Sequence, residues 1–266
     1  MTGGPFWIIG CGNMAGAMLR RWVETGLNIS HVHVVDPALP ALPGGLSALA
    51  AIPANVPPAD RILLAVKPQL LDAVAADVSR LVGPQTQLLS ILAGVDIATL
   101  KTRFPTAAQI VRIMPNLPAA LGKGVIALHS AEGPDAGIGA FMAPLGLVEW
   151  IADEAQLHLV AALAASGPAF LYRFIDALGV AGARLGLDPD QSARLALAMV
   201  EGSALLAAQS NDAPAVLADR VASKGGMTRE GLDVLDKDEA LVRLLTDTLD
   251  AATRRSKEMG DEARRP

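Results

Sequence analysis

Short apolar runs alternate with longer amphipathic stretches over the first half of the chain. The runs are bounded by Gly, Pro or polar residues, as buried strands are, and lie at residues 6–9, 31–35, 61–66, 87–92 and 109–113. The stretches between them have helical length or spacing and lie at residues 13–25, 69–82 and 96–104. Strands that alternate with helices predict an α/β domain with a doubly wound sheet.

Two further runs, 124–129 and 147–151, predict additional strands at the edge of this sheet, around a helix that begins near Pro134. Residues 37–58 are rich in Pro, Gly and Ala. We expect an irregular connection there in place of a full crossover helix.

The strand pattern ends near residue 154, and Ala, Leu and Gly recur at helical spacing beyond it. We therefore expect two domains, a dinucleotide-binding domain over 1–153 and an all-helical domain over 154–266. Asp188-Pro189 has the form of an N-cap followed by Pro at the first helical position, and opens a predicted helix to about Gln209. Asp212 before Pro214 repeats that form, and Ser166-Gly167-Pro168 predicts a helix start or break. The charged tail 254–266 is expected to fray.

Composition excludes several classes of function. A net charge of −5 with 3% aromatic residues argues against nucleic-acid binding. The four scattered His residues form no metal-ligand pattern, so we expect no metal. No uninterrupted apolar run is judged long enough for a membrane span, and residues 1–5 lack the basic start of a secretory signal, which favours a cytoplasmic protein. The single cysteine, Cys11, excludes an internal disulfide.

A glycine-rich turn follows the first predicted strand and opens the first predicted helix. It reads Gly10-Cys11-Gly12-Asn13-Met14. Gly10 permits a tight turn, Gly12 permits close approach of a pyrophosphate, and the helix start supplies N–H groups and a positive dipole. This placement predicts dinucleotide binding. Cys11 is interpreted as a small loop residue, because no base or resolving cysteine accompanies it.

Asp36 ends the second predicted strand, where a carboxylate can accept hydrogen bonds from the adenosine ribose and repel a 2′-phosphate. No Lys or Arg follows before Arg61. We therefore expect a nicotinamide coenzyme, NAD(P)H, with NADH used at least as well as NADPH. The alternative is a solvated turn acid before Pro37.

Three later motifs end predicted strands, where ligands of open α/β sheets bind. They are Ala65-Val66-Lys67-Pro68-Gln69, Ser90-Ile91-Leu92-Ala93-Gly94 and Arg112-Ile113-Met114-Pro115-Asn116-Leu117-Pro118. With Ser166-Gly167-Pro168-Ala169 and Gly225-Gly226-Met227-Thr228 in the helical half, they form an ordered set that closely resembles the pyrroline-5-carboxylate reductase family over residues 6 to 236.

The resemblance implies NAD(P)H-dependent reduction of the cyclic imine 1-pyrroline-5-carboxylate to L-proline, the last step of proline biosynthesis. It implies a homodimer, or a ring of dimers, formed by the helical domain. It places Ala65, Val66, Lys67, Pro68, Ala93 and Gly94 on the coenzyme and Asn116 on the substrate. By chemistry alone, Lys67 and Arg112 read equally well as surface or ion-pair residues, and Asn116 as a turn residue.

Ser223-Lys224-Gly225-Gly226-Met227-Thr228 is the most informative stretch of the helical half. Consecutive glycines before a helix can aim backbone N–H groups at an anion such as a carboxylate. The resemblance implies substrate binding by Ser223, Gly225, Gly226, Met227 and Thr228, with Thr228 beside the ring nitrogen as the catalytic-site residue. Chemistry alone favours Thr228 as a helix N-cap. Lys224 and Met227 depart from the usual family pattern of Pro and a small or hydroxyl residue.

Two other readings compete. A β-hydroxyacid dehydrogenase has a similar two-domain plan but needs a general base, usually a lysine in the long interdomain helix, and residues 155–172 contain none. A non-catalytic nucleotide-sensing module needs only the first half of the chain and leaves the Gly225–Thr228 loop unexplained. An absorbance assay with the imine, compared with hydroxyacids, separates these classes.

Overall fold

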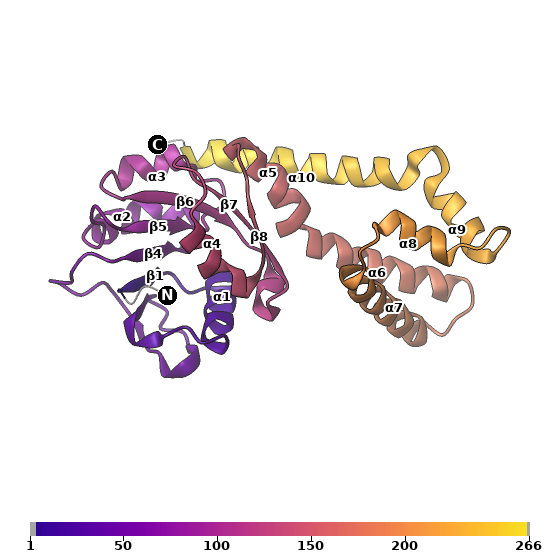
Figure 1. Cartoon of the computed structure of the whole chain (residues 1–266), viewed down its shortest axis with the longest axis horizontal. Coiled ribbons are helices and arrows are strands. Elements are labelled where there is room, and N and C mark those ends of the chain that lie inside the picture. Colours follow the sequence, from indigo (N-terminus) through magenta and orange to yellow (C-terminus); the bar gives the residue numbers. More distant parts are fainter. Residues whose placement is uncertain (1–3, 265–266) are drawn as a thin grey trace. The chain divides into compact units, whose positions relative to one another are not determined.

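The computed structural model describes residues 4–264. Residues 1–3 of the opening stretch and 265–266 of the charged tail lie outside the described residues. Eight strands form one sheet in the order β3-β2-β1-β4-β5-β6-β7-β8 (Figure 1). The strands are β1 Phe6–Ile9, β2 Val32–Val35, β3 Ala48–Leu49, β4 Arg61–Leu64, β5 Gln87–Ser90, β6 Gln109–Met114, β7 Gly124–His129 and β8 Gly146–Trp150.

The predicted doubly wound sheet is confirmed. Neighbouring strands from β3 to β6 are parallel, β7 runs antiparallel to β6, and β8 is again parallel to β7. The short strand β3, paired with β2 through Val34 and Ala48, lies inside the segment expected to be irregular. The sequence pattern missed it because a two-residue strand carries no periodicity of its own.

Helices of the first half cover both faces of the sheet. They are α1 Asn13–Glu24, α2 Leu71–Ser79, α3 Ile97–Arg103, α4 Ala136–Met142 and α5 Leu157–Val160. Along β1, Phe6 and Ile8 belong to one buried cluster and Trp7 and Ile9 to the other. A strand buried on both faces is the expected consequence of parallel βαβ connections, and it explains the continuous apolar runs in the sequence.

The second half of the chain is helical, as predicted. Its helices are α6 Gly167–Arg184, α7 Pro189–Gln209, α8 Pro214–Val221, α9 Met227–Asp236 and α10 Ala240–Arg264. Gly179 of α6 lets α7 approach closely, since a Cβ there would lie 3.2 Å from the Cα of Ala193. The Ser192 hydroxyl donates to the Gly179 carbonyl at 2.8 Å, which ties the two helices together.

The structure confirms one of the two helix N-caps predicted from an Asp near a Pro and contradicts the other. Asp188 caps α7 by accepting from the Gln191 N–H at 2.9 Å, and Asp96 caps α3 in the same way. The cap expected at Asp212 is wrong, because Ala213 takes the N-cap position of α8 and the Asp212 carboxylate pairs with Arg220 instead. The tail expected to fray is helical through Arg264.

The chain groups into two compact units, residues 1–166 together with 251–266, and residues 167–250. The sequence-based boundary at 153/154 differs from this grouping. Residues 154–166 contact the sheet unit: Glu154 binds the start of α3, and Leu157 is 1% exposed. The end of α10 belongs to the same unit, where Ser256 hydrogen-bonds to His158 at 2.9 Å.

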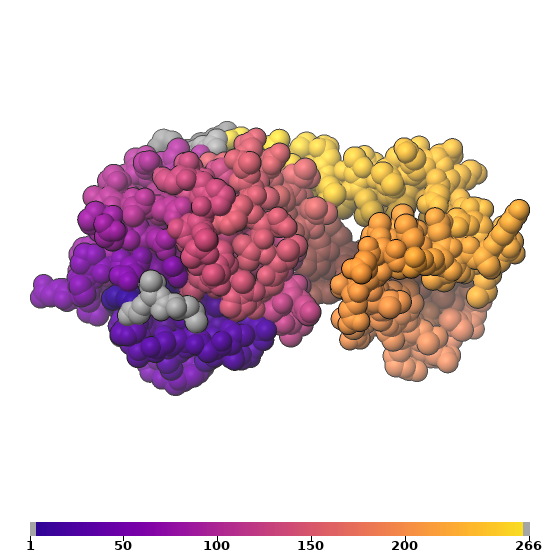
Figure 2. Space-filling view, in the orientation of Figure 1, coloured from indigo at the N-terminus to yellow at the C-terminus, as the bar shows by residue number. Residues whose placement is uncertain are grey.

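The unit 167–250 has little interior. The buried apolar residues of this unit are Ala196 and Ala222, whereas large side chains on every helix are exposed. Figure 2 shows the surface of helices α8 and α9 in orange to yellow-orange. The stretch Glu154–Arg184 is long and apolar enough to cross a membrane by length and composition. The sequence-based expectation of no such run is wrong, because Ala155–Tyr172 contains no charged residue.

Candidate coenzyme and substrate sites

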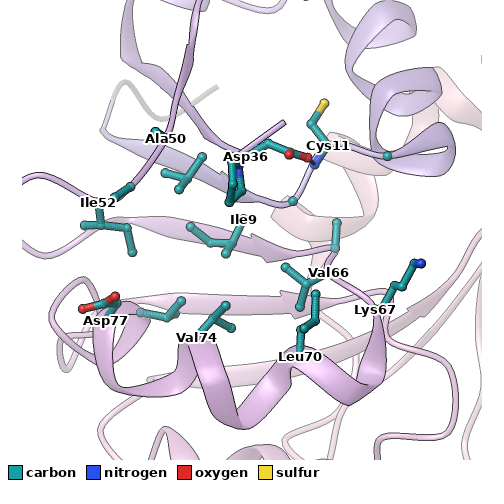
Figure 3. Close-up of a pocket in the computed structure, with 17 residues that line it drawn as sticks. Ile9, Cys11, Asp36, Ala50, Ile52, Val66, Lys67, Leu70, Val74 and Asp77 are labelled. Carbon is teal, nitrogen blue, oxygen red and sulfur yellow. Dashed lines mark hydrogen bonds between the residues drawn. The ribbon is translucent and has the colours of Figure 1, made fainter. Parts of the chain in front are cut away.

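A cavity of about 430 Å³ opens at the carboxyl ends of β1, β2, β3 and β4 (Figure 3). Several predicted coenzyme residues line it together: Gly10, Cys11, Gly12, Asp36, Ala65, Val66 and Lys67. The neighbouring residues Asn13 and Met14 open α1, and Pro68 opens the short helical turn 68–70. The carboxyl edge of a parallel sheet is where ligands of such folds bind.

Glycine suits position 10 and position 12 for different structural reasons. Gly10 has φ +86°, and a Cβ there would lie 2.9 Å from the backbone of Ala65. Only glycine fits that position without displacing β4. Gly12 has an ordinary φ of −72°, and a Cβ there would meet no atom within 4 Å. The space beside Gly12 is therefore open to a ligand.

Gly12 also takes the N-cap position of α1 without a side-chain cap. The first N–H groups of an α-helix have no partner within the helix and carry the positive end of its dipole. A phosphate is the ligand that such a helix start favours next to an open glycine. The turn therefore fits the pyrophosphate of a dinucleotide.

Asp36 lies directly across from the glycine-rich turn. One carboxylate oxygen accepts from the Cys11 N–H at 2.7 Å, and the other accepts from the Ala38 N–H at 2.9 Å. The second bond is that of a turn acid, and the first connects the carboxylate to the turn. The contacts of a turn acid are therefore present, and the carboxylate also lines the cavity, where the predicted ribose contact stays a prediction.

Cys11 has a buried thiol, 7% exposed as a residue. Burial, followed by the nearby Asp36 charge, raises the pKa of the Cys11 thiol above its ordinary value, and Arg20 opposes this rise. A thiol held protonated is a poor nucleophile. In Figure 3 its sulfur points away from the wall formed by Val66, Leu70 and Val74.

The cavity has an apolar wall that the sequence analysis did not single out. Ala50 and Ile52, which follow β3, lie across the cavity from Leu70 and Val74 of the α2 region, and Ala51 lines the same cavity. An apolar slot beside an acidic strand end suits an adenine ring and its ribose. The signal for this wall was hidden in the segment 37–58, because β3 was not recognised.

A second cavity, of about 340 Å³, lies within the same unit. Ala93 and Gly94 line it with Arg112, Met114 and His158. Gly94 has φ +77°, and a Cβ there would lie 3.1 Å from the Cα of Gly260 in α10. The turn after β5 is therefore held against the end of the C-terminal helix.

Asn116, expected on the substrate, is 6% exposed and serves the backbone. Its amide nitrogen donates to the Ala164 carbonyl at 2.9 Å, and its amide oxygen accepts from the Val125 N–H at 2.9 Å. These bonds connect the end of β6 to β7 and to the residues before α6. One amide N–H has capacity left for a further acceptor.

In the helical unit, the loop 223–226 leads into α9. Gly225 has a left-handed φ of +70°, and Gly226 is the N-cap of α9 without a side-chain cap. Thr228 is the second residue of the helix, so the N-cap reading of Thr228 is wrong. Met227 is 92% exposed. No side chain caps α9, and the Arg229 N–H already donates to the Gly226 carbonyl at 3.0 Å, so the N–H groups of Met227 and Thr228 are those offered to an anion.

An ion pair connects α9 to α8 next to this loop. The Arg229 guanidinium binds the Asp219 carboxylate of α8 at 2.7 Å. This pair raises the pKa of Arg229 above its usual range. Ser223 accepts from the Gly226 N–H through its carbonyl at 2.9 Å, which closes the turn. Among residues 4–264, no group of three or more His, Cys, Asp or Glu side chains could hold a metal ion.

The sheet topology, the uncapped glycine turn and the strand-end acid define a dinucleotide-binding oxidoreductase domain, followed by a helical unit. Comparison with known proteins agrees with this class. Residues 6–94 match the family "NADP oxidoreductase coenzyme F420-dependent", and residues 154–259 match "Pyrroline-5-carboxylate reductase dimerisation".

Sequence relatives give the particular family. The chain is 32% identical over 265 residues to pyrroline-5-carboxylate reductase of Pseudomonas aeruginosa, covering 96% of each protein. It is 30% identical over 266 residues to pyrroline-5-carboxylate reductase 3 of Danio rerio, covering 97% of this chain and 92% of the relative. The chain belongs to the pyrroline-5-carboxylate reductase family.

A solved structure agrees with this assignment over the whole chain. The structure of a pyrroline-5-carboxylate reductase from Coxiella burnetii has a TM-score of 0.87 and 27% identity, covering 97% of this chain and 99% of that one. The Plasmodium falciparum pyrroline carboxylate reductase with NADP bound has a TM-score of 0.78 at 24% identity and shows the shared fold. The expected fold class is therefore confirmed.

Proposed function

We propose that this protein reduces 1-pyrroline-5-carboxylate to L-proline with a reduced nicotinamide coenzyme, as the last step of proline biosynthesis. The observation that carries the proposal is the uncapped glycine turn opposite Asp36 at the carboxyl edge of the sheet, in a chain of this family. The class of reaction is hydride transfer to a C=N bond.

The residues present fit the coenzyme. Gly12 leaves open space at the start of α1 for the pyrophosphate, and the apolar wall of Ile52 and Val74 suits the adenine. The turn 93–94 after β5 is assigned to the nicotinamide end, in line with the family resemblance. When bound, the reduced coenzyme supplies a hydride, and the protein's task is to align donor and acceptor.

The loop 223–228 is assigned to the substrate. The N–H groups of Gly225 and of the first turn of α9 suit the carboxylate of a cyclic imino acid. Thr228 has no cap role, which leaves its hydroxyl free to donate to or accept from the ring nitrogen. A protonated imine is electron-poor and accepts hydride readily, so a dedicated acid is not required and water can supply the nitrogen proton.

The finer proposal on coenzyme choice is that NADH is used at least as well as NADPH. Asp36 is followed by Pro37 and Ala38, and Lys67 is the basic residue among the described residues that line the cavity. A carboxylate favours the free ribose diol and repels a 2′-phosphate. We propose this preference as a property of the Asp36 side chain.

We further propose that the functional unit is a homodimer formed through residues 167–250. This unit exposes large apolar residues on every helix, including Phe174, Leu197 and Leu206, and buries few of its own. A second copy that covers these faces supplies the interior that the unit lacks. The same cover accounts for the exposed apolar residues of 167–184, the part of the apolar stretch that lies in this unit, without a membrane.

The test is an absorbance assay of purified protein. Loss of reduced-nicotinamide absorbance with pyrroline-5-carboxylate, together with formation of L-proline, is the expected result. Reduction of oxidised coenzyme by hydroxyacids would indicate a β-hydroxyacid dehydrogenase, although the stretch 154–184 contains no lysine to act as base. Coenzyme binding without turnover of either substrate class would indicate a nucleotide-sensing module.

A further inference from the structure

Glu154 is shared by two partners from distant parts of the sheet unit. Its Oε1 atom accepts from Arg112 Nη1 at 2.8 Å and from the backbone N–H of Ile97 at 2.9 Å. Arg112 lies on β6 and is 5% exposed, and Ile97 is the first residue of α3. Glu154 therefore joins the end of β6 to the start of α3, from a position 57 residues away from Ile97.

The segment that Glu154 holds is the turn after β5. Only Val95 and Asp96 separate Gly94 from Ile97. Val95 is 3% exposed, and Asp96 caps α3 by accepting from the Thr99 N–H at 2.7 Å. Because Val95 is buried and Asp96 is held by the cap, we expect a displacement of Ile97 to move Gly94 as well.

The same turn lines the second cavity on the side where Arg112 also lies. Gly94, Arg112 and Met114 all face this space of about 340 Å³. Arg112 needs its carboxylate partner, since a buried guanidinium without one is costly and moves toward water. Loss of Glu154 would release both the Ile97 N–H and the Arg112 side chain at one wall of the cavity.

We propose that Glu154 is a positioning residue for hydride transfer, which sets the turn 93–97 against the nicotinamide end of the coenzyme. The inference rests on the proposed function. Glu154 touches neither coenzyme nor substrate in this role. It acts through the Ile97 N–H and through Arg112.

A positioning role for Glu154 predicts different effects on the two ends of the coenzyme. The adenine end of the coenzyme lies in the first cavity, whose lining residues do not include Glu154, Ile97 or Arg112. Substitution of Glu154 should therefore change how the nicotinamide end is held and leave binding of the adenosine diphosphate part unaltered. A small displacement at the reacting end is enough to lower turnover strongly.

The experiment compares Glu154→Ala, Glu154→Gln and the control Asp72→Ala. Asp72 pairs with Arg103 at the opposite end of α3, at 2.7 Å, so the control also removes an ion pair from this helix. For each protein, kcat and KM with pyrroline-5-carboxylate are measured, as are the dissociation constants of NADH and of ADP-ribose, which lacks nicotinamide.

We expect Glu154→Ala to lower kcat by about tenfold and to weaken NADH binding by about threefold. The affinity for ADP-ribose and the KM for the imine should stay within about twofold of the wild type. Glu154→Gln keeps an oxygen acceptor for Ile97 and should give intermediate values. Asp72→Ala should match the wild type in all four quantities.

If the substitution weakened binding of NADH and of ADP-ribose equally, or left kcat unchanged, the inference would be overturned. If Glu154→Ala does not fold, Glu154→Gln decides alone, because its ratio of NADH to ADP-ribose affinity must still fall. If the wild type binds NADH but does not reduce the imine, the proposed function fails, while the affinity ratio still decides the positioning role.

Discussion

The Asp36 carboxylate accepts a hydrogen bond from the backbone N–H of Cys11 at 2.7 Å. This bond connects the end of β2 to the glycine-rich turn after β1, 25 residues earlier in the chain. One side chain thus orders the turn and also presents negative charge to the cavity beside it. If Asp36 sets the coenzyme choice as proposed, that choice is coupled to the geometry of the turn through this bond.

We expect Asp36→Ser to shift the coenzyme preference toward NADPH. Serine retains a hydrogen-bond acceptor for the turn but removes the charge that repels a 2′-phosphate. The ratio of kcat/KM for NADH to that for NADPH should be at least one in the wild type and fall by roughly tenfold in the variant, a difference of about 1.4 kcal/mol.

Asp77→Ser is the matched control, since it removes a carboxylate that lines the same cavity but pairs with Arg80. Its coenzyme ratio should stay near that of the wild type. A wild-type enzyme that strongly prefers NADPH, with a ratio unmoved by Asp36→Ser, would show that Asp36 acts only as a turn acid.

Thr228→Ala should slow reduction of the imine without weakening coenzyme binding. The side chain is not the cap of α9, so its loss should leave the helix start intact and remove the proposed substrate contact. Loss of one neutral hydrogen bond costs about 0.5–1.5 kcal/mol, which corresponds to a decrease in kcat/KM of up to about tenfold. Steady-state kinetics with the imine and titration with NADH measure the two effects.

Thr228→Ser should restore most of the activity, because it restores the hydroxyl. Thr246→Ala removes a hydroxyl bonded to the Val242 carbonyl within α10 and serves as the control. A loss of thermal stability in Thr228→Ala with unchanged kinetics would show a structural role for this threonine.

The local parts of the fold could be predicted from the sequence, and the parts that depend on distant pairing could not. Gly10, the start of α1 at Asn13 and the Asp188 cap follow from short-range sterics and hydrogen bonding. Strand β3 depends on pairing with β2, and Glu154 reaches Ile97 across the fold. No pattern of neighbouring residues encodes either contact.

The candidate site divides in the same way. The strand-end motifs around Gly10, Asp36 and Ala65 could be placed because parallel strands share one carboxyl edge. The backbone contacts of Asn116 could not be foreseen, since its partners Val125 and Ala164 come from separate elements. Thr228 was misassigned by chemistry alone because Gly226, two residues earlier, takes the cap position.

A charge placed on the exposed apolar face of α7 should separate the proposed dimer. Leu206 is 67% exposed in the single chain, and burying Glu in an apolar interface is strongly unfavourable. We expect Leu206→Glu to sediment as a smaller species than the wild type and to lose activity. Leu147→Glu, on edge strand β8 and 58% exposed, is the control in the other unit. A wild type that is fully active as a monomer would refute the dimer.

The Cys11 thiol should react slowly with alkylating reagents. Its pKa is raised by burial and by Asp36, so the thiolate fraction at any pH below that raised pKa is smaller than for a free cysteine. The pH profile of iodoacetamide modification should therefore lie at higher pH than that of a free thiol. At neutral pH, the rate of modification should be lower than that of a free thiol by about tenfold or more.

The chain has one cysteine, so mass spectrometry reports this site alone. The denatured protein should react at the rate of a free thiol, and Cys11→Ala should retain activity. Rapid alkylation of the folded protein at neutral pH, with loss of turnover in Cys11→Ala, would contradict the interpretation of Cys11 as a passive loop residue.

Gly10→Ala and Gly12→Ala should separate a structural glycine from a ligand-facing one. In Gly10→Ala, the new Cβ would lie 2.9 Å from the Ala65 backbone at a φ of +86°, so the free energy of unfolding should fall by roughly 1–3 kcal/mol. In Gly12→Ala, the Cβ enters open space at an ordinary φ, so the melting temperature should stay close to that of the wild type while NADH affinity falls. Gly231→Ala in α9, where a Cβ would also meet nothing, should leave NADH affinity unchanged and raise the melting temperature slightly, because alanine favours the helix interior over glycine. Thermal unfolding and NADH titration of the three variants measure the pattern. If Gly12→Ala bound NADH as tightly as the wild type, the pyrophosphate could not lie against Gly12, and the assignment of this turn to the coenzyme would fail.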